Sequence, residues 1–328
     1  MQQEEQTVGS AIDVTDLRRE YVTRSFLTRT TKVTVALGGI SLHVAKGELF
    51  GLIGPNGAGK TTTIKILTTL LAPTSGKALI LGLDIDKDMY EIRRRIGIVF
   101  GGERGLYNRV TAVENLRYFA NLYGVRPAEI GGRVERLVKL VGLEGRENDR
   151  VEKYSRGMKQ RLHIAKALIH DPELVFLDEP TIGLDPGGAR DIRNMVRQMK
   201  EEGKTIFLTT HNMFEADELC DRIAVISKGR IVALDTPAGL KRSVKDISVI
   251  ELQTYEATSA FVERLEKIPG VTRVVPDLDS ERQLIKVQTA TPAEVLPLVS
   301  AAAGDVTIID KTIKEPTLED AYLRLVEE

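Results

Sequence analysis

Cysteine, net charge and long apolar runs are all scarce in this sequence, and each scarcity excludes a class of protein. The single cysteine, Cys220, cannot form a disulfide within the chain and is typical of a reducing compartment. The formal net charge of -1 gives no electrostatic reason to expect nucleic acid as a partner. No apolar run approaches the roughly 20 residues that cross a bilayer. The polar, acidic start (MQQEEQTVGS) does not resemble a signal peptide, so we expect a cytosolic chain whose membrane-spanning partner, if any, is another polypeptide.

Strand-like and helical segments alternate through most of the chain. This alternation predicts an α/β domain with a largely parallel sheet. Shorter strands around turns, over 12–19 and 33–48, predict an antiparallel layer beside that sheet. The main predicted strands are 48–53, 174–177, 205–209 and 223–227, and the main predicted helices are 61–71, 157–170 and 188–202.

The pattern changes near Pro237, and this change predicts a second domain. Segments such as DISVIELQ and RQLIKVQT predict strands, and TSAFVERLEKIPG predicts a helix. The complete order, β-α-β-β-α-β-α, predicts a small ferredoxin-like α+β domain. We expect one domain over 12–240 and an accessory domain over 246–328.

The segment GPNGAGKTT fits the phosphate-loop pattern G-x-x-x-x-G-K-[ST], and it lies between a predicted strand and a predicted helix. Glycines let successive backbone N–H groups point at phosphates, and the helix N-terminus adds its positive dipole end. Lys60 would reach the β- and γ-phosphates, Thr61 would bind Mg²⁺, and Thr62 would contact the α-phosphate. The predicted nucleotide-binding residues here are Gly54, Pro55, Asn56, Gly57, Ala58, Gly59, Lys60, Thr61 and Thr62.

The segment LVFLDEP places two carboxylates at the C-terminal end of a buried strand. Ligands bind at that end of a parallel sheet. We predict that Asp178 holds Mg²⁺, directly or through water, and that Glu179 is the general base for the attacking water. An apolar run that ends in Asp-Glu is a weak signal alone and a strong one downstream of a phosphate loop.

Between these two segments lies YSRGMKQR, which begins a predicted helix and resembles the signature of the ABC ATPase family, roughly L-S-G-G-Q. Ser155 and Gly157 match that signature, while Tyr154, Arg156 and Met158 depart from it. The resemblance implies that Ser155 and Gly157 bind the γ-phosphate of ATP held by a second subunit. In isolation this segment would be read as an N-capped basic surface helix.

Further residues resemble the same family over about 12–240. Gly183, Leu184 and Asp185 resemble the loop after the catalytic glutamate, which pairs across the dimer. His211 resembles the switch histidine at the γ-phosphate, and Tyr21 resembles the aromatic residue that stacks on adenine. The alternatives are a satisfied structural histidine and a half-buried strand tyrosine. The implied fold is an ABC-type P-loop domain with a parallel-sheet core, an antiparallel β layer and a helical subdomain.

The end of the chain, PTLEDAYLRLVEE, resembles that of bacterial drug-exporter ATPases of the daunorubicin-resistance type. The resemblance implies an ATPase that forms a head-to-tail homodimer around two ATP molecules and Mg²⁺. It also implies integral membrane permease subunits as partners, with this chain peripheral on the cytoplasmic side of the membrane. We expect the docking surface for these subunits between Gly101 and about Arg150.

One family feature is missing from the sequence. The glutamine expected after the strand RRIGIVF is replaced by glycine, at Gly102 or at Gly101. Our hypothesis is that Glu103 supplies the missing oxygen, and the alternative is a solvated loop residue paired with Arg104.

Two other functions are alternatives to that of a transporter subunit. A soluble ABC protein that acts on DNA or ribosomes would carry long coiled coils or tandem nucleotide domains, and this sequence has neither. An ATP-sensing module without hydrolysis would be favoured if Glu179 were replaced, and it is present.

Overall fold

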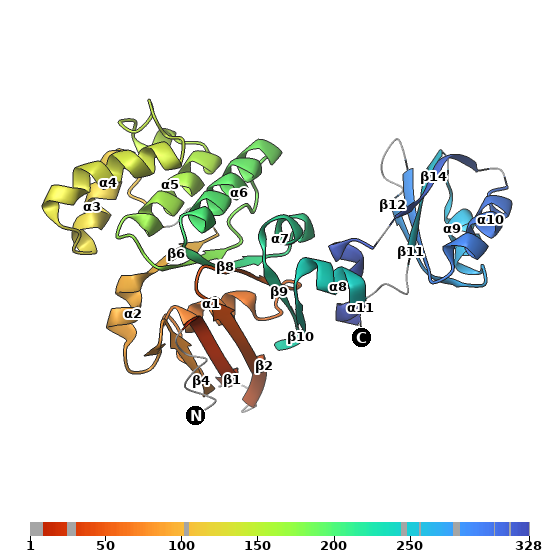
Figure 1. The fold of residues 1–328 in the computed structure, drawn as a ribbon, viewed down its shortest axis with the longest axis horizontal. Helices are drawn as coiled ribbons and strands as arrows, with labels where there is room; N and C mark the ends of the chain where they lie inside the picture. Colours follow the sequence, from red (N-terminus) through yellow and green to blue (C-terminus); the bar gives the residue numbers. More distant parts are fainter. Residues whose placement is uncertain are drawn as a thin grey trace. The chain divides into compact units, whose positions relative to one another are not determined.

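The computed structural model describes residues 9–24, 31–101, 105–243, 248–255, 257–277, 283–304, 306–314 and 316–327. The chain divides into two compact units, Met1–Thr236 and Pro237–Glu328 (Figure 1). Within the described ranges, no helix is both long enough and apolar enough to cross a membrane.

The first unit is built on a six-stranded sheet in which five neighbouring strands are parallel and one edge strand is antiparallel. Three neighbouring interior strands, called the middle strands below, are buried at every residue, in line with the apolar runs LFGLI, LVFL and IFL in their sequences. The predicted parallel core is therefore confirmed. In sheet order the strands are β10 (Arg230–Asp235), β9 (Arg222–Ser227), β3 (Leu49–Ile53), β8 (Thr205–Thr210), β7 (Leu174–Asp178) and β6 (Ile96–Phe100).

A second, antiparallel sheet forms the expected β layer, with the order β2-β1-β4-β5. Its two long strands differ from the prediction of short strands around turns. Gly39 takes a φ of +99° at a register shift, so the chain bulges there and the ladder continues to the pair Arg24–Thr31. These strands are β1 (Ser10–Arg24), β2 (Thr31–Ala45), β4 (Ser75–Ile80) and β5 (Leu83–Asp84).

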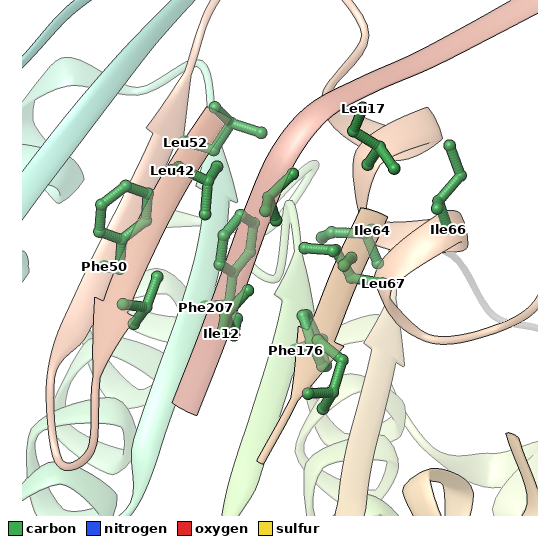
Figure 2. Packing of buried hydrophobic residues seen from close by; sticks show 14 of the residues in the cluster. Ile12, Leu17, Leu42, Phe50, Leu52, Ile64, Ile66, Leu67, Phe176 and Phe207 are labelled. Atoms are coloured by element: carbon green, nitrogen blue, oxygen red, sulfur yellow. The ribbon is translucent and has the colours of Figure 1, made fainter. Parts of the chain in front are cut away.

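The core of the first unit lies between the two sheets and the helix α1 (Lys60–Leu67). Three phenylalanines, one on each middle strand, form a row across the sheet (Figure 2). The ring centroids of Phe50 and Phe207 are 5.6 Å apart, and those of Phe207 and Phe176 are also 5.6 Å apart. Each fully buried phenylalanine stabilises the fold by about 1.5–3 kcal/mol relative to an exposed one.

Helices cover the other side of the central sheet, where Figure 1 shows α5 and α6 opposite β1, β2 and β4. The predicted helix over 61–71 ends earlier, at Leu67, because Thr69 adopts a φ of +61°. The remaining helices of this unit are α2 (Met89–Arg95), α3 (Ala112–Leu122), α4 (Pro127–Leu140), a 3-10 turn (Val151–Lys153), α5 (Arg156–Leu168), α6 (Pro186–Glu201) and α7 (Met213–Leu219).

The second unit contains a four-stranded antiparallel sheet in the order β12-β13-β11-β14. Helices α9 and α10 share one apolar core with that sheet, in which Phe261 and Val299 meet Leu252 and Val287. The helices α8 and α11 pack against each other. The elements are α8 (Pro237–Ser243), β11 (Ser248–Tyr255), α9 (Ser259–Glu266), β12 (Val271–Asp277), β13 (Gln283–Thr289), α10 (Pro292–Ala302), β14 (Thr307–Lys314) and α11 (Leu318–Glu327).

Candidate functional site

The predicted phosphate loop, Gly54–Thr62, connects the buried strand β3 to α1. Its backbone adopts left-handed conformations at Gly57 (φ +82°) and Gly59 (φ +115°), which L side chains rarely tolerate. Gly54 is required by space, because a Cβ there would lie 2.3 Å from the carbonyl oxygen of Ile226. Glycine is therefore required at Gly57 and Gly59 by backbone conformation and at Gly54 by lack of space for a side chain.

The Lys60 ammonium group is buried, with 5% of the residue exposed. Its Nζ donates to the carbonyl oxygens of Gly54 at 2.7 Å and Pro55 at 3.2 Å. The same Nζ lies 3.5 Å from Oε1 of Glu179. A buried cation needs such partners, and they hold Lys60 over the loop toward the end of β7.

Asp178 ends β7 and is buried, with 6% of the residue exposed. Its carboxylate accepts from the hydroxyl of Thr61 at 3.0 Å and from the hydroxyl of Thr209 at 2.5 Å. Thr209 was not predicted from the sequence. Its signal would have been the parallel register, in which Asp178 and Thr209 are direct neighbours on β7 and β8.

Glu179 lies between the phosphate loop and the loop that follows β8. Its Oε2 is 3.3 Å from Nδ1 of His211, while its Oε1 faces Lys60. The residue has a φ of +49°, and its backbone N–H donates to the carbonyl oxygen of Thr209 at 2.9 Å. Strained backbone of this kind in a non-glycine residue is typical of functional sites. The structure therefore brings Lys60, Glu179 and His211 together.

A buried carboxylate supports the loop that carries His211. Oε2 of Glu215 accepts from the hydroxyl of Thr210 at 2.8 Å, and that hydroxyl oxygen accepts from the backbone N–H of Asn212 at 3.0 Å. Glu215 is only 1% exposed, and its Oε1 has no hydrogen-bond partner in the described part of the chain. No sequence pattern predicts this role, because an acidic residue in a first helical turn is normally exposed.

The residues predicted to face a second subunit lie at two helix N-termini. Ser155 caps α5 by accepting from the backbone N–H of Met158 at 3.2 Å, and Gly157 follows in the first turn. Asp185 caps α6 by accepting from the backbone N–H of Gly188 at 3.3 Å. Among the described residues, neither Ser155 nor Gly157 forms a hydrogen bond to the phosphate loop of its own chain.

Tyr154 replaces the apolar residue that begins the family signature, and its side chain is buried. Only 5% of Tyr154 is exposed, and its hydroxyl donates to the carbonyl oxygen of Arg146 at 2.7 Å. Burial raises the pKa of the Tyr154 phenol. The hydroxyl is therefore neutral at physiological pH and serves as a structural donor.

Tyr21 lies on the strand pair that borders the phosphate loop. It is 39% exposed, and the guanidinium carbon of Arg19 lies 4.8 Å from the centre of its ring. Tyr21 pairs with Thr34 on β2. Three residues further along β2, a side-chain carbon of Leu37 would lie 2.8 Å from a Cβ on Gly59. Tyr21 therefore lies on β1, whose partner strand β2 contacts the phosphate loop, and it is not part of the group formed by Lys60, Glu179 and His211.

The position of the missing glutamine is described only in part. Gly101 follows β6, and a Cβ at this residue would lie 3.2 Å from the carbonyl oxygen of Asp178. A side chain at this residue would therefore require its neighbours to shift by a few tenths of an ångström. Gly102 and Glu103 lie outside the described residues, so the hypothesis for Glu103 stays a prediction.

Comparison with known proteins identifies the family. The family model described as "ABC transporter" matches residues 37–182. The Daunorubicin resistance ATP-binding protein DrrA3 of Streptomyces coeruleorubidus is 35% identical over 88% of this chain and 90% of its own length. The Fluoroquinolones export ATP-binding protein Rv2688c of Mycobacterium tuberculosis is 48% identical over 63% of this chain and 67% of its own length.

Solved structures agree with the sequence comparison. The dimeric structure of a post-hydrolysis state of the ATP-binding cassette MJ0796, bound to ADP and Pi, is 26% identical with a TM-score of 0.61. The match covers 69% of this chain and 98% of that one. The resemblance to drug-resistance ATPases and the ABC ATPase fold, both predicted from the sequence, are confirmed. The chain belongs to the family of ABC transporter ATP-binding proteins and is an ABC ATPase.

Proposed function

We propose that this chain is the ATP-hydrolysing motor of an exporter. The observation that carries the proposal is the meeting of Lys60, Asp178, Glu179 and His211 at the ends of three neighbouring parallel strands. That edge of a parallel sheet is where phosphate ligands bind. Export as the direction of transport is supported by the similarity to a fluoroquinolone export protein.

Each group at this edge has a proposed role in hydrolysis. The backbone N–H groups of Gly54–Thr62 and the ammonium of Lys60 bind the phosphates of ATP. Glu179 accepts the proton of the attacking water, and His211 contacts the γ-phosphate while its Nδ1 orients the Glu179 carboxylate, 3.3 Å away.

Mg²⁺ is the proposed metal, held by Thr61 and Asp178. The donors fit, because a hydroxyl oxygen and a carboxylate oxygen 3.0 Å apart are the hard ligands that this ion prefers. In the described part of the chain, no group of three His, Cys, Asp or Glu side chains is arranged so that it could hold a metal ion by itself. The phosphates would therefore complete the coordination, and the ion would neutralise the charge that develops on them.

The complete site is proposed to need a second copy of the chain. Ser155, Gly157 and Asp185 lie at exposed helix N-termini, whose unpaired N–H groups suit a phosphate on another subunit. Tyr21 is proposed to stack on adenine beside the loop of its own chain. A homodimer would then enclose two ATP molecules, in line with the dimer formed by the similar cassette MJ0796.

The proposed partners are integral membrane permease subunits, with this chain on the cytoplasmic face of the membrane and without a nucleic-acid partner. The expected docking region, 101–150, contains a hollow of about 660 Å³. Aromatic side chains line it, and Tyr107 and Tyr118 are 50% and 48% exposed. The lining residues are Leu106, Tyr107, Asn108, Arg109, Val110, Glu114 and Tyr118.

The proposed domains are 12–240 for nucleotide binding and 246–328 for an accessory domain of ferredoxin-like type. The sheet order β12-β13-β11-β14, with one helix after β11 and one after β13, supports the ferredoxin-like topology. A chain cut near Asp246 should therefore stay folded and still bind ATP. Loss of ATP binding in a truncated chain that remains folded would contradict the proposed boundary.

The central experiment compares the wild-type chain with Lys60→Ala, because Lys60 faces both the loop and Glu179. Nucleotide affinity is measured with a fluorescent ATP analogue, and phosphate release is measured in parallel. We expect Lys60→Ala to weaken binding at least about tenfold, since it removes a buried charge that contacts phosphate. The exposed Lys65 on α1 gives the control Lys65→Ala, which should bind normally. Normal affinity in Lys60→Ala would contradict the site.

A further inference from the structure

Arg156 occupies the signature position where the related family has glycine, and it is the first residue of α5. A cation at a helix N-terminus is disfavoured by the helix dipole. Among the described residues, no carboxylate forms an ion pair with Arg156 to offset that cost. The position of the Arg156 side chain must therefore depend on a contact other than an ion pair.

The guanidinium group of Arg156 packs over Gly183. A Cβ built on Gly183 would lie 2.2 Å from Nη1 of Arg156 and 2.5 Å from its Cζ, so the guanidinium fills the space of the missing side chain. Gly183 also has a φ of +70°, which favours glycine independently. A planar guanidinium can pack against a planar peptide group, whereas a lysine ammonium is a compact point charge without such a flat surface.

The loop beneath Arg156 leads directly from Glu179 to the helix α6. Two turns form it: the N–H of Ile182 donates to the carbonyl oxygen of Glu179 at 3.2 Å, and that of Leu184 donates to Thr181 at 3.1 Å. Ile182 is 42% exposed, and Gly183 is exposed and has no side chain of its own, so the loop buries little surface at these two residues. A group that presses on Gly183 therefore acts on the segment whose first residue is Glu179.

We propose that Arg156 is a positioning residue that joins the N-terminus of α5 to the Glu179–Asp185 loop. It holds in one arrangement the Ser155 end of α5, the cap of α6 and the backbone of Glu179. The inference rests on the proposed function only for its effect on hydrolysis. The ordering of the loop is a property of the chain without nucleotide.

The first test measures hydrogen exchange of the Ile182 and Leu184 amides in the full chain without nucleotide. Arg156→Ala should accelerate their exchange at least about tenfold, because the turns open more often. The matched control is Arg190→Ala, which removes an exposed arginine from α6 and should leave both amides unchanged. Arg156→Lys should behave like Arg156→Ala. Wild-type protection in Arg156→Ala, or full rescue by Arg156→Lys, would overturn the inference.

The second test measures ATP turnover. Arg156→Ala should lower kcat at least about fivefold with little change in nucleotide affinity, since misplacement of a catalytic group costs rate rather than binding. In a double-mutant cycle, Gly183→Ala and Arg156→Ala should be non-additive, because both break the same contact. Additive losses would overturn the inference. Absence of ATP hydrolysis in the wild-type chain would instead contradict the proposed function, and the exchange result would still decide the role of Arg156.

Discussion

Replacing Glu179 by glutamine tests the chemistry of the site with the smallest change in shape. The side chain keeps its size, and the φ of +49° at this residue suits glutamine as well as it suits glutamate. The amide, however, cannot accept a proton from water. Loss of a general base typically costs 10²–10⁴-fold, which is about 3–5 kcal/mol of transition-state stabilisation. We expect the turnover number to fall by at least about a hundredfold.

The same substitution should strengthen ATP binding. Oε1 of Glu179 lies 3.5 Å from Nζ of Lys60, so the carboxylate competes with the γ-phosphate for the ammonium. Removing that charge should tighten binding by at least about 0.5 kcal/mol, because this pair is less exposed to solvent than the surface ion pairs for which that magnitude is typical. Unhydrolysed ATP would then favour the dimer, because a ligand stabilises the state that binds it.

The assays are phosphate release, titration with a fluorescent ATP analogue, and light scattering with and without ATP. Glu201→Gln is the matched control, since Glu201 is exposed at the end of α6 and makes the same chemical change away from the site. Turnover within about threefold of the wild type in Glu179→Gln would refute the assignment of Glu179 as the base. Weaker ATP binding would refute the competition for Lys60.

Three further predictions concern the support of the site and the stability of the unit. Thr209→Val removes a hydroxyl that donates to Asp178, so it should lower the free energy of unfolding by about 1–3 kcal/mol. It should also raise the Mg²⁺ concentration needed for half-maximal ATPase activity, and unchanged values of both quantities would contradict this prediction. Glu215→Ala frees the Thr210 hydroxyl in a buried site, so we expect about 1–3 kcal/mol of destabilisation in denaturant titration and slower hydrolysis. A hydrogen bond from Lys204 lowers the pKa of Asp171 in the folded chain. The ionised Asp171 therefore adds to the free energy of unfolding above the ordinary carboxyl pKa, and this stabilisation is lost as the pH falls through the pKa of the folded state. Asp171→Asn should therefore destabilise by less than about 1 kcal/mol near neutral pH, and the difference from wild type should vanish in acid.

The parallel core could be predicted from the sequence because its physical signal is local. Apolar runs such as Leu174–Asp178 end in polar residues, and the ends of parallel strands gather at one edge of a sheet. That rule also predicted that Asp178 and Glu179 would stand at the edge of the sheet where ligands bind. The roles of the residues at that edge depend on ligands and remain predictions.

The contacts missed by the sequence are those that depend on three-dimensional register. The hydroxyl of Thr209 reaches Asp178 only because β7 and β8 are neighbours in the sheet. Burial of Glu215 depends on how α7 packs, and no periodic pattern encodes it. The bulge at Gly39 resembled a turn, since glycine serves both conformations equally well.

The row of phenylalanine rings has a consequence for the thermal inactivation of the protein. Phe176 and Phe207 each lie two residues before a side chain of the site, Asp178 and Thr209, on the same strands. Asp178 and Thr209 therefore lie on the same strands as the buried phenylalanines, with no loop between them and the core. Thermal inactivation should consequently coincide with cooperative melting of this unit, and it should not begin at lower temperature as it does in enzymes whose catalytic groups sit on long mobile loops.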